Sequence, residues 1–242
     1  EQVVPARQAG LPVVSVAAII QHNTSSLISL AGDGIESPAD LAGTTYGGFG
    51  GGFEEALVRA LVSCDGGDPD SVTFANVGEA DYRDGLTRDQ YDSVWVFDAW
   101  DVIRMRDLDG LALNRIAFAD HTDCIPDWYT PVLIAEERAV EEPSDALRRF
   151  LEVTRRGYQA AMADPAASAD ALLEAVPELD AKLVRASAAY LSTRYADDAA
   201  RWGHQEATVW NDFVAFLVEH DLVEPGFDVD AAYDDTLLST GG

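Results

Sequence analysis

Several short stretches of the chain combine aromatic rings, carboxylates and glycines, which suits recognition of a small ring-containing molecule. Residues 47–52 form a glycine-rich run between an extended segment and an amphipathic helix that starts near Phe53. Backbone N–H groups at such a helix start can face a ligand, although a tight turn without a ligand explains the same pattern. Because Glu54 and Glu55 put negative charge at the positive end of the helix, a neutral or cationic ligand is favoured over an anion. The candidate ligand-binding residues here are Gly48, Phe49, Gly50 and Glu54.

A second candidate follows the predicted strand 93–97, since ligands in α/β sheets bind beyond the carboxyl ends of strands. Trp100 could stack on a flat ring, and Asp98 could accept hydrogen bonds from amino groups. The alternative is a core tryptophan beside a solvated aspartate, which is the commoner arrangement.

Two further stretches are rich in polar or aromatic groups. Residues 127–131 offer Asp127 and Tyr129, and a loop packed around Pro131 is the alternative interpretation. Residues 21–26 follow an apolar segment, and an ordinary connecting loop would explain them equally well. Their candidate ligand-binding residues are Gln21, His22 and Asn23.

The sequence is poor in catalytic and metal-binding patterns. Its four histidines are far apart and lack the spacing of a zinc helix. Residues 120–124 contain groups that can ligate metals, but an exposed polar loop is favoured over a metal site. No Gly-x-Ser-x-Gly elbow, dinucleotide fingerprint or phosphate-binding loop is present. We therefore expect no catalytic residues, no bound metal and no cofactor, and a protein that is not an enzyme.

The charge excludes one class of partner. There are 43 acidic and 16 basic residues, and the formal net charge of -27 repels nucleic acid and anionic lipid. Lys182 is the only lysine. This balance fits adaptation to high salt, where self-repulsion is screened, and equally fits a genome rich in G and C. No apolar run is long enough to span a membrane. Whether Cys64 and Cys124 form a disulfide is left open.

Apolar periodicity predicts an α/β fold with largely parallel sheets. Strands are expected at residues 13–20, 27–30, 72–77, 93–97 and within 111–118, with a helix after residue 53 and a short one at 81–87. The last third is expected to be helical, with amphipathic helices along 147–162, 183–190 and 202–217.

The order of several segments resembles the family of periplasmic binding proteins for thiamine pyrimidine precursors. The resemblance rests on residues 11–25, on residues 37–43, on the Tyr46-Gly47-Gly48-Phe49-Gly50 loop, on Tyr129-Thr130-Pro131 and on residues 176–180. It extends along essentially the whole chain, and the order and spacing of the segments are more specific than any one of them.

The resemblance implies a type II periplasmic-binding-protein-like fold of two lobes that close on a ligand by a hinge. Residues 1–26 would then be the remainder of lobe 1 and a crossover. Residues 27–126 would be lobe 2, and residues 127–242 the return crossover and a helical part that packs on lobe 1. Family members begin with a further lobe-forming segment, which is expected to be missing here, together with the export signal.

The resemblance also implies a function. The protein would be a periplasmic or extracellular lipoprotein that binds a small aminopyrimidine and delivers it to the permease subunits of an ABC importer. The alternatives are another solute, such as riboflavin, a sulfonate or nitrate, and the pyrimidine-synthesising enzymes of the same fold family. Those enzymes rely on a cysteine-rich motif, a lysine and a histidine. This chain has no cysteine cluster, and Lys182 falls in the helical tail.

Overall fold

The computed structural model describes residues 1–78, 81–142 and 145–238. The chain divides into two compact units. Unit 1 combines Glu1–Asn23 with Asp127–Gly242, and unit 2 is the continuous segment Thr24–Pro126. The first boundary thus lies after Asn23, whereas the family resemblance implied a boundary after residue 26.

Unit 2 contains a five-stranded mixed sheet in the order β4-β3-β5-β2-β6. The strands listed from sequence in this unit are confirmed, with their ends shifted by a few residues, as β2 (Ser25–Leu30), β4 (Thr73–Asn76), β5 (Ser93–Phe97) and β6 (Leu113–Ala117). The extended segment before the glycine-rich run is β3 (Thr45–Gly48).

The expectation of largely parallel pairing is only half correct. β3 pairs in parallel with β4 and β5, but β2 runs antiparallel to both of its neighbours, β5 and β6. β3, β4, β5 and β6 therefore share one direction, and β2 alone is reversed. The reason is that β2 is inserted between two strands that follow it in the chain, a pairing which local periodicity cannot reveal.

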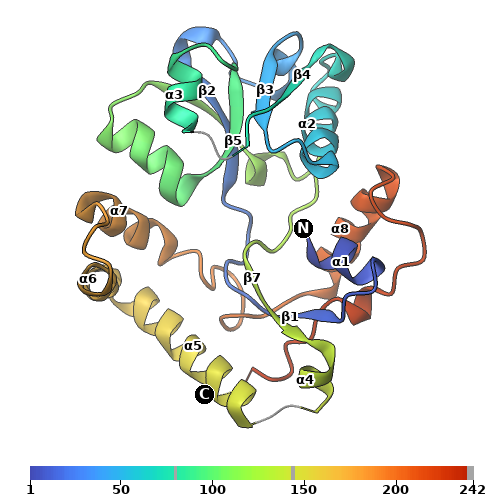
Figure 1. The fold of residues 1–242 in the computed structure, drawn as a ribbon, viewed down its shortest axis with the longest axis vertical. Helices are drawn as coiled ribbons and strands as arrows, with labels where there is room; N and C mark the ends of the chain where they lie inside the picture. Colours follow the sequence, from blue (N-terminus) through green and yellow to red (C-terminus); the bar gives the residue numbers. More distant parts are fainter. Residues whose placement is uncertain (79–80, 143–144, 239–242) are drawn as a thin grey trace. The chain divides into compact units, whose positions relative to one another are not determined.

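Helices cover both faces of this sheet (Figure 1). On one face, α3 (Tyr82–Thr87) and the π-helix η4 (Asp98–Leu108) pack on the sheet through a buried apolar cluster. On the other face, α2 (Gly52–Cys64) buries Leu57, Val58, Leu61 and Val62, and its Phe53 contacts Trp95 of β5. The 3₁₀ helices of this unit are η1 (Ala31–Asp33), η2 (Pro38–Leu41), η3 (Pro69–Ser71) and η5 (Phe118–His121).

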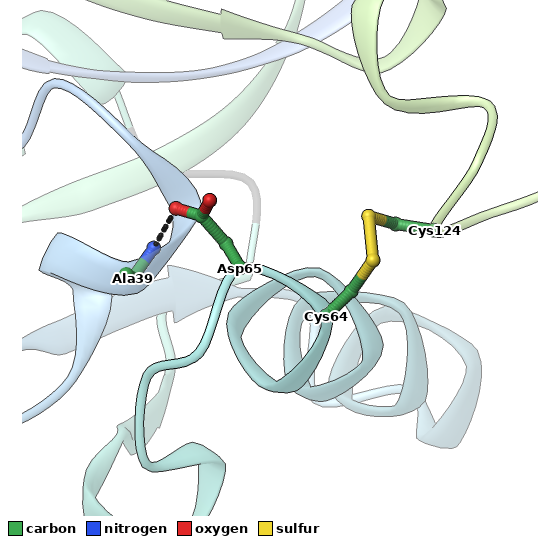
Figure 2. Close-up of a disulfide and its surroundings, with 4 residues drawn as sticks. All are labelled: Ala39, Cys64, Asp65 and Cys124. Carbon is green, nitrogen blue, oxygen red and sulfur yellow. Dashed lines mark hydrogen bonds between the residues drawn. A yellow bond between two sulfur atoms is a disulfide. The ribbon is translucent and has the colours of Figure 1, made fainter.

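A disulfide joins Cys64, the last residue of α2, to Cys124 in the loop that leads out of unit 2 (Figure 2). Beside it, the Asp65 carboxylate accepts a 2.9 Å hydrogen bond from the backbone N–H of Ala39 in η2. The C-terminal end of α2 is thus tied to two other segments of the unit. The question that the sequence left open is settled in favour of pairing.

Unit 1 is built around a two-stranded antiparallel sheet of β1 (Val13–Ala18) and β7 (Val132–Glu136). β7 was not expected from sequence. The sheet is covered by an apolar cluster that includes Val14, Val16, Leu151 and Trp202. The helices of this unit are α1 (Val3–Gln8), α4 (Glu137–Glu141), α5 (Asp145–Ala163), α6 (Pro165–Ala175), α7 (Ala181–Leu191), α8 (Ala207–Glu219) and the 3₁₀ helix η6 (Val229–Ala231).

The expected helical C-terminal third is confirmed in α5, α7 and α8. α6, which begins at Pro165, lies between two of the expected helices and was not predicted. Proline is tolerated at the first position of a helix, and Asp164 caps α6 by accepting from the N–H of Ala167. Within the described residues, no helix is both long and apolar enough to cross a membrane.

Candidate functional site

In unit 2, the predicted site residues gather at one edge of the five-stranded sheet. The carboxyl ends of β3, β4, β5 and β6 meet there because these strands run in one direction, and β2 starts at the same edge. The glycine loop follows β3, and η4 follows β5 with Asp98 and Trp100 in its first turn. The topology therefore places the glycine loop and the start of η4 at the same edge of the sheet, although they are far apart in sequence.

The glycine loop is shorter than expected, because Gly47 and Gly48 belong to β3 and Gly52 begins α2. Gly50 adopts a φ of +79°, which L side chains rarely adopt. A Cβ on Gly50 would also lie 2.6 Å from Asn76 Nδ2, at the end of β4. A hollow of about 170 Å³ lies beside this loop.

The carboxylate of Glu54 occupies the start of α2. It accepts hydrogen bonds from the backbone N–H of Phe49 at 2.8 Å, from that of Gly51 at 3.5 Å and from the Tyr46 hydroxyl at 3.0 Å. The N–H groups that we expected to face a ligand are thus already paired within the protein. A negative charge fills the place that an anion would take.

Asp98 has a different environment from the one expected. It is only 3% exposed. Its Oδ1 accepts from the Ser26 hydroxyl at 2.6 Å, and its Oδ2 accepts from Arg115 Nη2 at 2.7 Å. Arg115 Nε is 3.1 Å from both carboxylate oxygens. Asp98 is therefore neither the ligand-facing acceptor that we predicted nor the solvated aspartate of the alternative, but a buried member of an ion pair with Arg115.

Trp100 is 39% exposed and forms part of the wall of a hollow of about 190 Å³ between α3 and η4. The same hollow is lined by Tyr82 and Met105, by the carboxylates of Asp81, Asp101 and Asp109, and by Arg83 and Arg104, which both pair with Asp109. Asp101 accepts from the N–H of Phe97 at 3.2 Å, and burial raises the pKa of its carboxyl. This hollow combines an aromatic surface with carboxylates, as recognition of an amino-substituted ring requires.

The four polar candidates of unit 1 bond mainly to residues of their own unit. His22 Nδ1 lies 2.6 Å from Asp127 Oδ2, and His22 Nε2 lies 3.1 Å from Asp198 Oδ1. The other oxygen of Asp127 accepts from the N–H of Asn23 at 2.9 Å. Gln21 Nε2 donates to the carbonyl of His204 at 3.1 Å. Asp127 thus ties together two chain segments that are far apart in sequence.

The charge of His22 is coupled to these contacts. Burial lowers the pKa of the imidazole, but its hydrogen bonds to Asp127 and Asp198 and their negative charges outweigh that effect, so the pKa is raised above its usual value. His22 is therefore charged over a wider pH range than a solvated histidine.

Tyr129 lies in the apolar interior of unit 1. It is 6% exposed, its ring is 6.2 Å from that of Trp210, and its hydroxyl oxygen accepts from the N–H of Glu206 at 2.8 Å. Burial raises its pKa to about 12. The side chain that we expected to stack on a ligand packs against a tryptophan instead.

Arg115, Asp101 and the pairing of His22 with Asp198 were not predicted from the sequence. A lone arginine within the strand 113–117 was a usable signal for the first, because a charge on a half-buried strand needs a partner. Among the described residues, one group of three potential metal ligands is close together, namely Cys64, Asp123 and Cys124. Its two cysteines are bonded to each other, so they offer no thiolates.

The fold is that of periplasmic binding proteins. The ligand-binding component of an ABC-type import system from Staphylococcus aureus, solved with zinc bound, matches with a TM-score of 0.70 and 15% identity, over 98% of this chain and 77% of that one. The periplasmic aliphatic sulphonate-binding protein SsuA of Escherichia coli matches with a TM-score of 0.70 and 16% identity, over 95% of this chain and 72% of that one. The fold class expected from sequence is confirmed.

The chain belongs to the NMT1/THI5-like family, whose profile matches residues 1–168. It is 27% identical over 229 residues to the formylaminopyrimidine-binding protein of Halalkalibacterium halodurans. The matched region covers 92% of this chain and 68% of that protein. It is 24% identical over 236 residues to the 4-amino-5-hydroxymethyl-2-methylpyrimidine phosphate synthase of Legionella pneumophila. That match covers 97% of this chain and 72% of the synthase. The family resemblance drawn from sequence is thus confirmed.

Proposed function

We propose that this protein binds an aminopyrimidine precursor of thiamine, outside the cytoplasm, and delivers it to the permease of an ABC importer. The observation that supports this most directly is the half-exposed ring of Trp100 on the wall of a hollow that also contains carboxylates. The relative from Halalkalibacterium halodurans is named for a formylaminopyrimidine. Such a ligand has a flat ring that can stack on Trp100 and an amino group that can donate to a carboxylate.

The size of the hollow suits a substituted six-membered ring. A cavity of about 150 Å³ in another protein holds benzene, and the hollow between α3 and η4 measures about 190 Å³. A ring stacked on Trp100 contributes about 1 kcal/mol beyond the area that it buries. The carboxylate of Asp101 is the acceptor that we assign to the amino group of the ligand, in place of Asp98, which is engaged by Arg115.

Charge supports a neutral or cationic ligand. Glu54 already occupies the start of α2, and the protein has a net charge of -27. A sulfonate or nitrate at the start of α2 would meet the Glu54 carboxylate, and near the hollow between α3 and η4 it would meet the overall negative field. Although the sulphonate-binding protein of Escherichia coli has the same fold, it is only 16% identical to this chain, and a shared fold does not transfer a ligand.

The disulfide supports a location outside the cytoplasm, because such bonds persist in oxidising compartments. Attachment to the membrane as a lipoprotein is part of the same proposal. We further propose that the protein does not convert its ligand chemically. Lys182, which is the only lysine, is exposed at the start of α7. An exposed position does not supply the desolvation that activates lysine for Schiff-base chemistry.

Calorimetry with a formylaminopyrimidine and a hydroxymethyl aminopyrimidine tests the ligand, with riboflavin, an alkanesulfonate and nitrate as competing candidates. We expect the aminopyrimidines to bind and Trp100→Ala to weaken binding about tenfold, whereas Trp100→Phe retains most of the affinity. Phe150→Ala, a comparable truncation of an exposed aromatic residue in unit 1, should leave binding unchanged.

The acceptor is tested separately with Asp101→Asn, which should weaken binding of the aminopyrimidine by about tenfold. Asp107→Asn is the matched control, because it removes an exposed carboxylate of the same helix that does not line the hollow. Binding of a sulfonate in place of the aminopyrimidines would contradict the assigned ligand. Binding that ignores both Trp100→Ala and Asp101→Asn would contradict the assigned site.

A further inference from the structure

Ser26, Asp98 and Arg115 form a hydrogen-bonded network at the start of η4 that the proposed function does not use. The Ser26 hydroxyl donates to Asp98 Oδ1 at 2.6 Å, and Arg115 Nη2 donates to Asp98 Oδ2 at 2.7 Å. Arg115 Nε lies 3.0 Å from the Ser26 hydroxyl oxygen, so the arginine reaches both partners. The network therefore joins side chains from β2, β6 and η4.

The first turn of η4 is also held by its main chain. The N–H of Asp98 donates to the carbonyl of Thr24 at 3.0 Å, just before β2. The carboxylate of Asp101 folds back and accepts from the N–H of Phe97 at 3.2 Å. Asp98 is thus tied to the start of β2 through both its backbone and its side chain. Because hydrogen bonds are directional, these contacts fix the rotation of the first turn about the helix axis.

Apolar packing alone does not set that rotation. Val102 and Met105 anchor η4 in the apolar cluster on the sheet, but apolar burial has no preferred direction. η4 is also a π-helix of 11 residues, a form that is rare and occurs mostly as single turns near functional sites. Its side chains are spaced differently around the axis from those of an α-helix, so a change of helix form would redirect Trp100 and Asp101.

The burial of Asp98 is not explained by stability. A carboxylate taken out of water costs free energy unless it is paired and hydrogen-bonded, and Asp98 is only 3% exposed. Replacing a buried ion pair by apolar residues of similar volume is often neutral or stabilising. What Arg115 adds is direction, because a guanidinium presents a planar fork to a carboxylate. Trp100 and Asp101, which line the hollow, follow Asp98 in the same turn.

We propose that Arg115 is a positioning residue of the ligand site. Through Asp98 it holds the first turn of η4 in the rotation that turns Trp100 and Asp101 toward the hollow between α3 and η4. Among the described residues, Arg115 does not line that hollow, so it acts through Asp98. This role rests on the proposed function where it concerns ligand affinity, whereas the orientation of Trp100 can be measured without a ligand.

The orientation of Trp100 is measured by fluorine NMR of protein that contains fluorotryptophan. The chain has five tryptophans, and the resonance of Trp100 is the one absent from Trp100→Phe. We expect Arg115→Met to shift or broaden this resonance. Arg115→Lys, which keeps a charge beside Asp98, should restore it in part. Arg106→Met is the matched control, because Arg106 belongs to η4 but pairs with the exposed Asp107, and it should leave the resonance unchanged.

Ligand affinity separates positioning from stability. Arg115→Met leaves the buried Asp98 carboxylate without its cation, so it should lower the Tm and weaken aminopyrimidine binding about tenfold in calorimetry. The triple change Ser26→Ala, Asp98→Val and Arg115→Met replaces the network by apolar groups and should restore most of the Tm. Affinity should remain about tenfold weaker and the Trp100 resonance displaced, because the directional bonds are still missing.

Two results would overturn the proposal. One is a Trp100 resonance that Arg115→Met and the triple change both leave in its wild-type position. The other is an affinity that returns together with the Tm in the triple change, because the network would then act only on stability. A wild-type protein that binds no aminopyrimidine would instead contradict the proposed function, and the Trp100 resonance would still decide whether Arg115 positions η4.

Discussion

At the residue scale, several carboxylates that we expected to bind a ligand have partners within the protein. Glu54 bonds to the glycine loop, Asp98 to Arg115, and Asp127 to His22 and Asn23. Sequence identified residues of the correct type near the end of each strand. It could not show which acidic groups were already paired, because the partners of Asp98 and Asp127 lie 17 to 105 positions away in the chain.

Glu54 should contribute to stability through the start of α2. We expect Glu54→Ala to lower the free energy of unfolding by about 1–2 kcal/mol, because the N–H of Phe49 and the buried Tyr46 hydroxyl lose their acceptor. Glu55→Ala removes the same charge from the neighbouring position, where Glu55 makes a solvated pair with Arg59, and should cost at most about 0.5 kcal/mol. Urea unfolding measures both, and equal losses would contradict the capping role.

His22 should make stability depend on pH. Its folded pKa is raised by Asp127 and Asp198, so the protonated form is favoured in the folded state. The stabilisation is therefore fully present below about pH 6.5, the unfolded pKa, and is lost as pH rises through the folded pKa.

We expect the difference in unfolding free energy between wild type and His22→Gln to be largest near pH 5.5 and to decrease toward pH 8.5. The effect should be modest, because the side chain is 46% exposed. His121→Gln, in unit 2, controls for the loss of a histidine elsewhere. A difference that is constant with pH, or that grows as pH rises, would exclude this coupling.

At the scale of elements, the sequence predicted β1, β2, β4, β5, β6, α2, α3 and the helical C-terminal third. Each has a clear apolar period or a local cap, such as Asp81 before α3. The reversed direction of β2, the pairing of β7 and the π-helix η4 were not predicted. The first two depend on partners distant in sequence, and a π-helix has no recognised local signature among these patterns.

The disulfide between Cys64 and Cys124 should stabilise unit 2 substantially. It closes a segment of 60 residues, for which chain entropy predicts a stabilisation of about 4 kcal/mol. We expect the double variant Cys64→Ser with Cys124→Ser to unfold at a lower urea concentration by this free energy.

A reducing agent supplies the matched control for the disulfide prediction. Reduction should lower the stability of the wild type toward that of the double variant and leave the variant itself unchanged. If the double variant were as stable as the oxidised wild type, the disulfide would not contribute to the free energy of unfolding, and the prediction would be wrong.

At the scale of the whole molecule, the net charge of -27 should make stability depend on salt. Mutual repulsion opposes the folded state, and salt screens it. We expect the Tm to rise from low salt to molar KCl. Most of the rise should occur below about 1 M, where the Debye length has fallen to about 3 Å. A Tm that is unchanged or lower in KCl would contradict adaptation of the acidic surface to salt.

The route of the chain through the two units has a consequence for biosynthesis. Unit 2 is continuous, whereas β1 of unit 1 pairs with β7, which is made only after unit 2 is complete. A chain that emerges from its N-terminus can therefore fold Thr24–Pro126 as a unit first. Meanwhile the apolar segment Val13–Ala18 remains without its partner strand. Until β7 emerges, this segment is the part of the nascent chain that a chaperone would have to shield from aggregation.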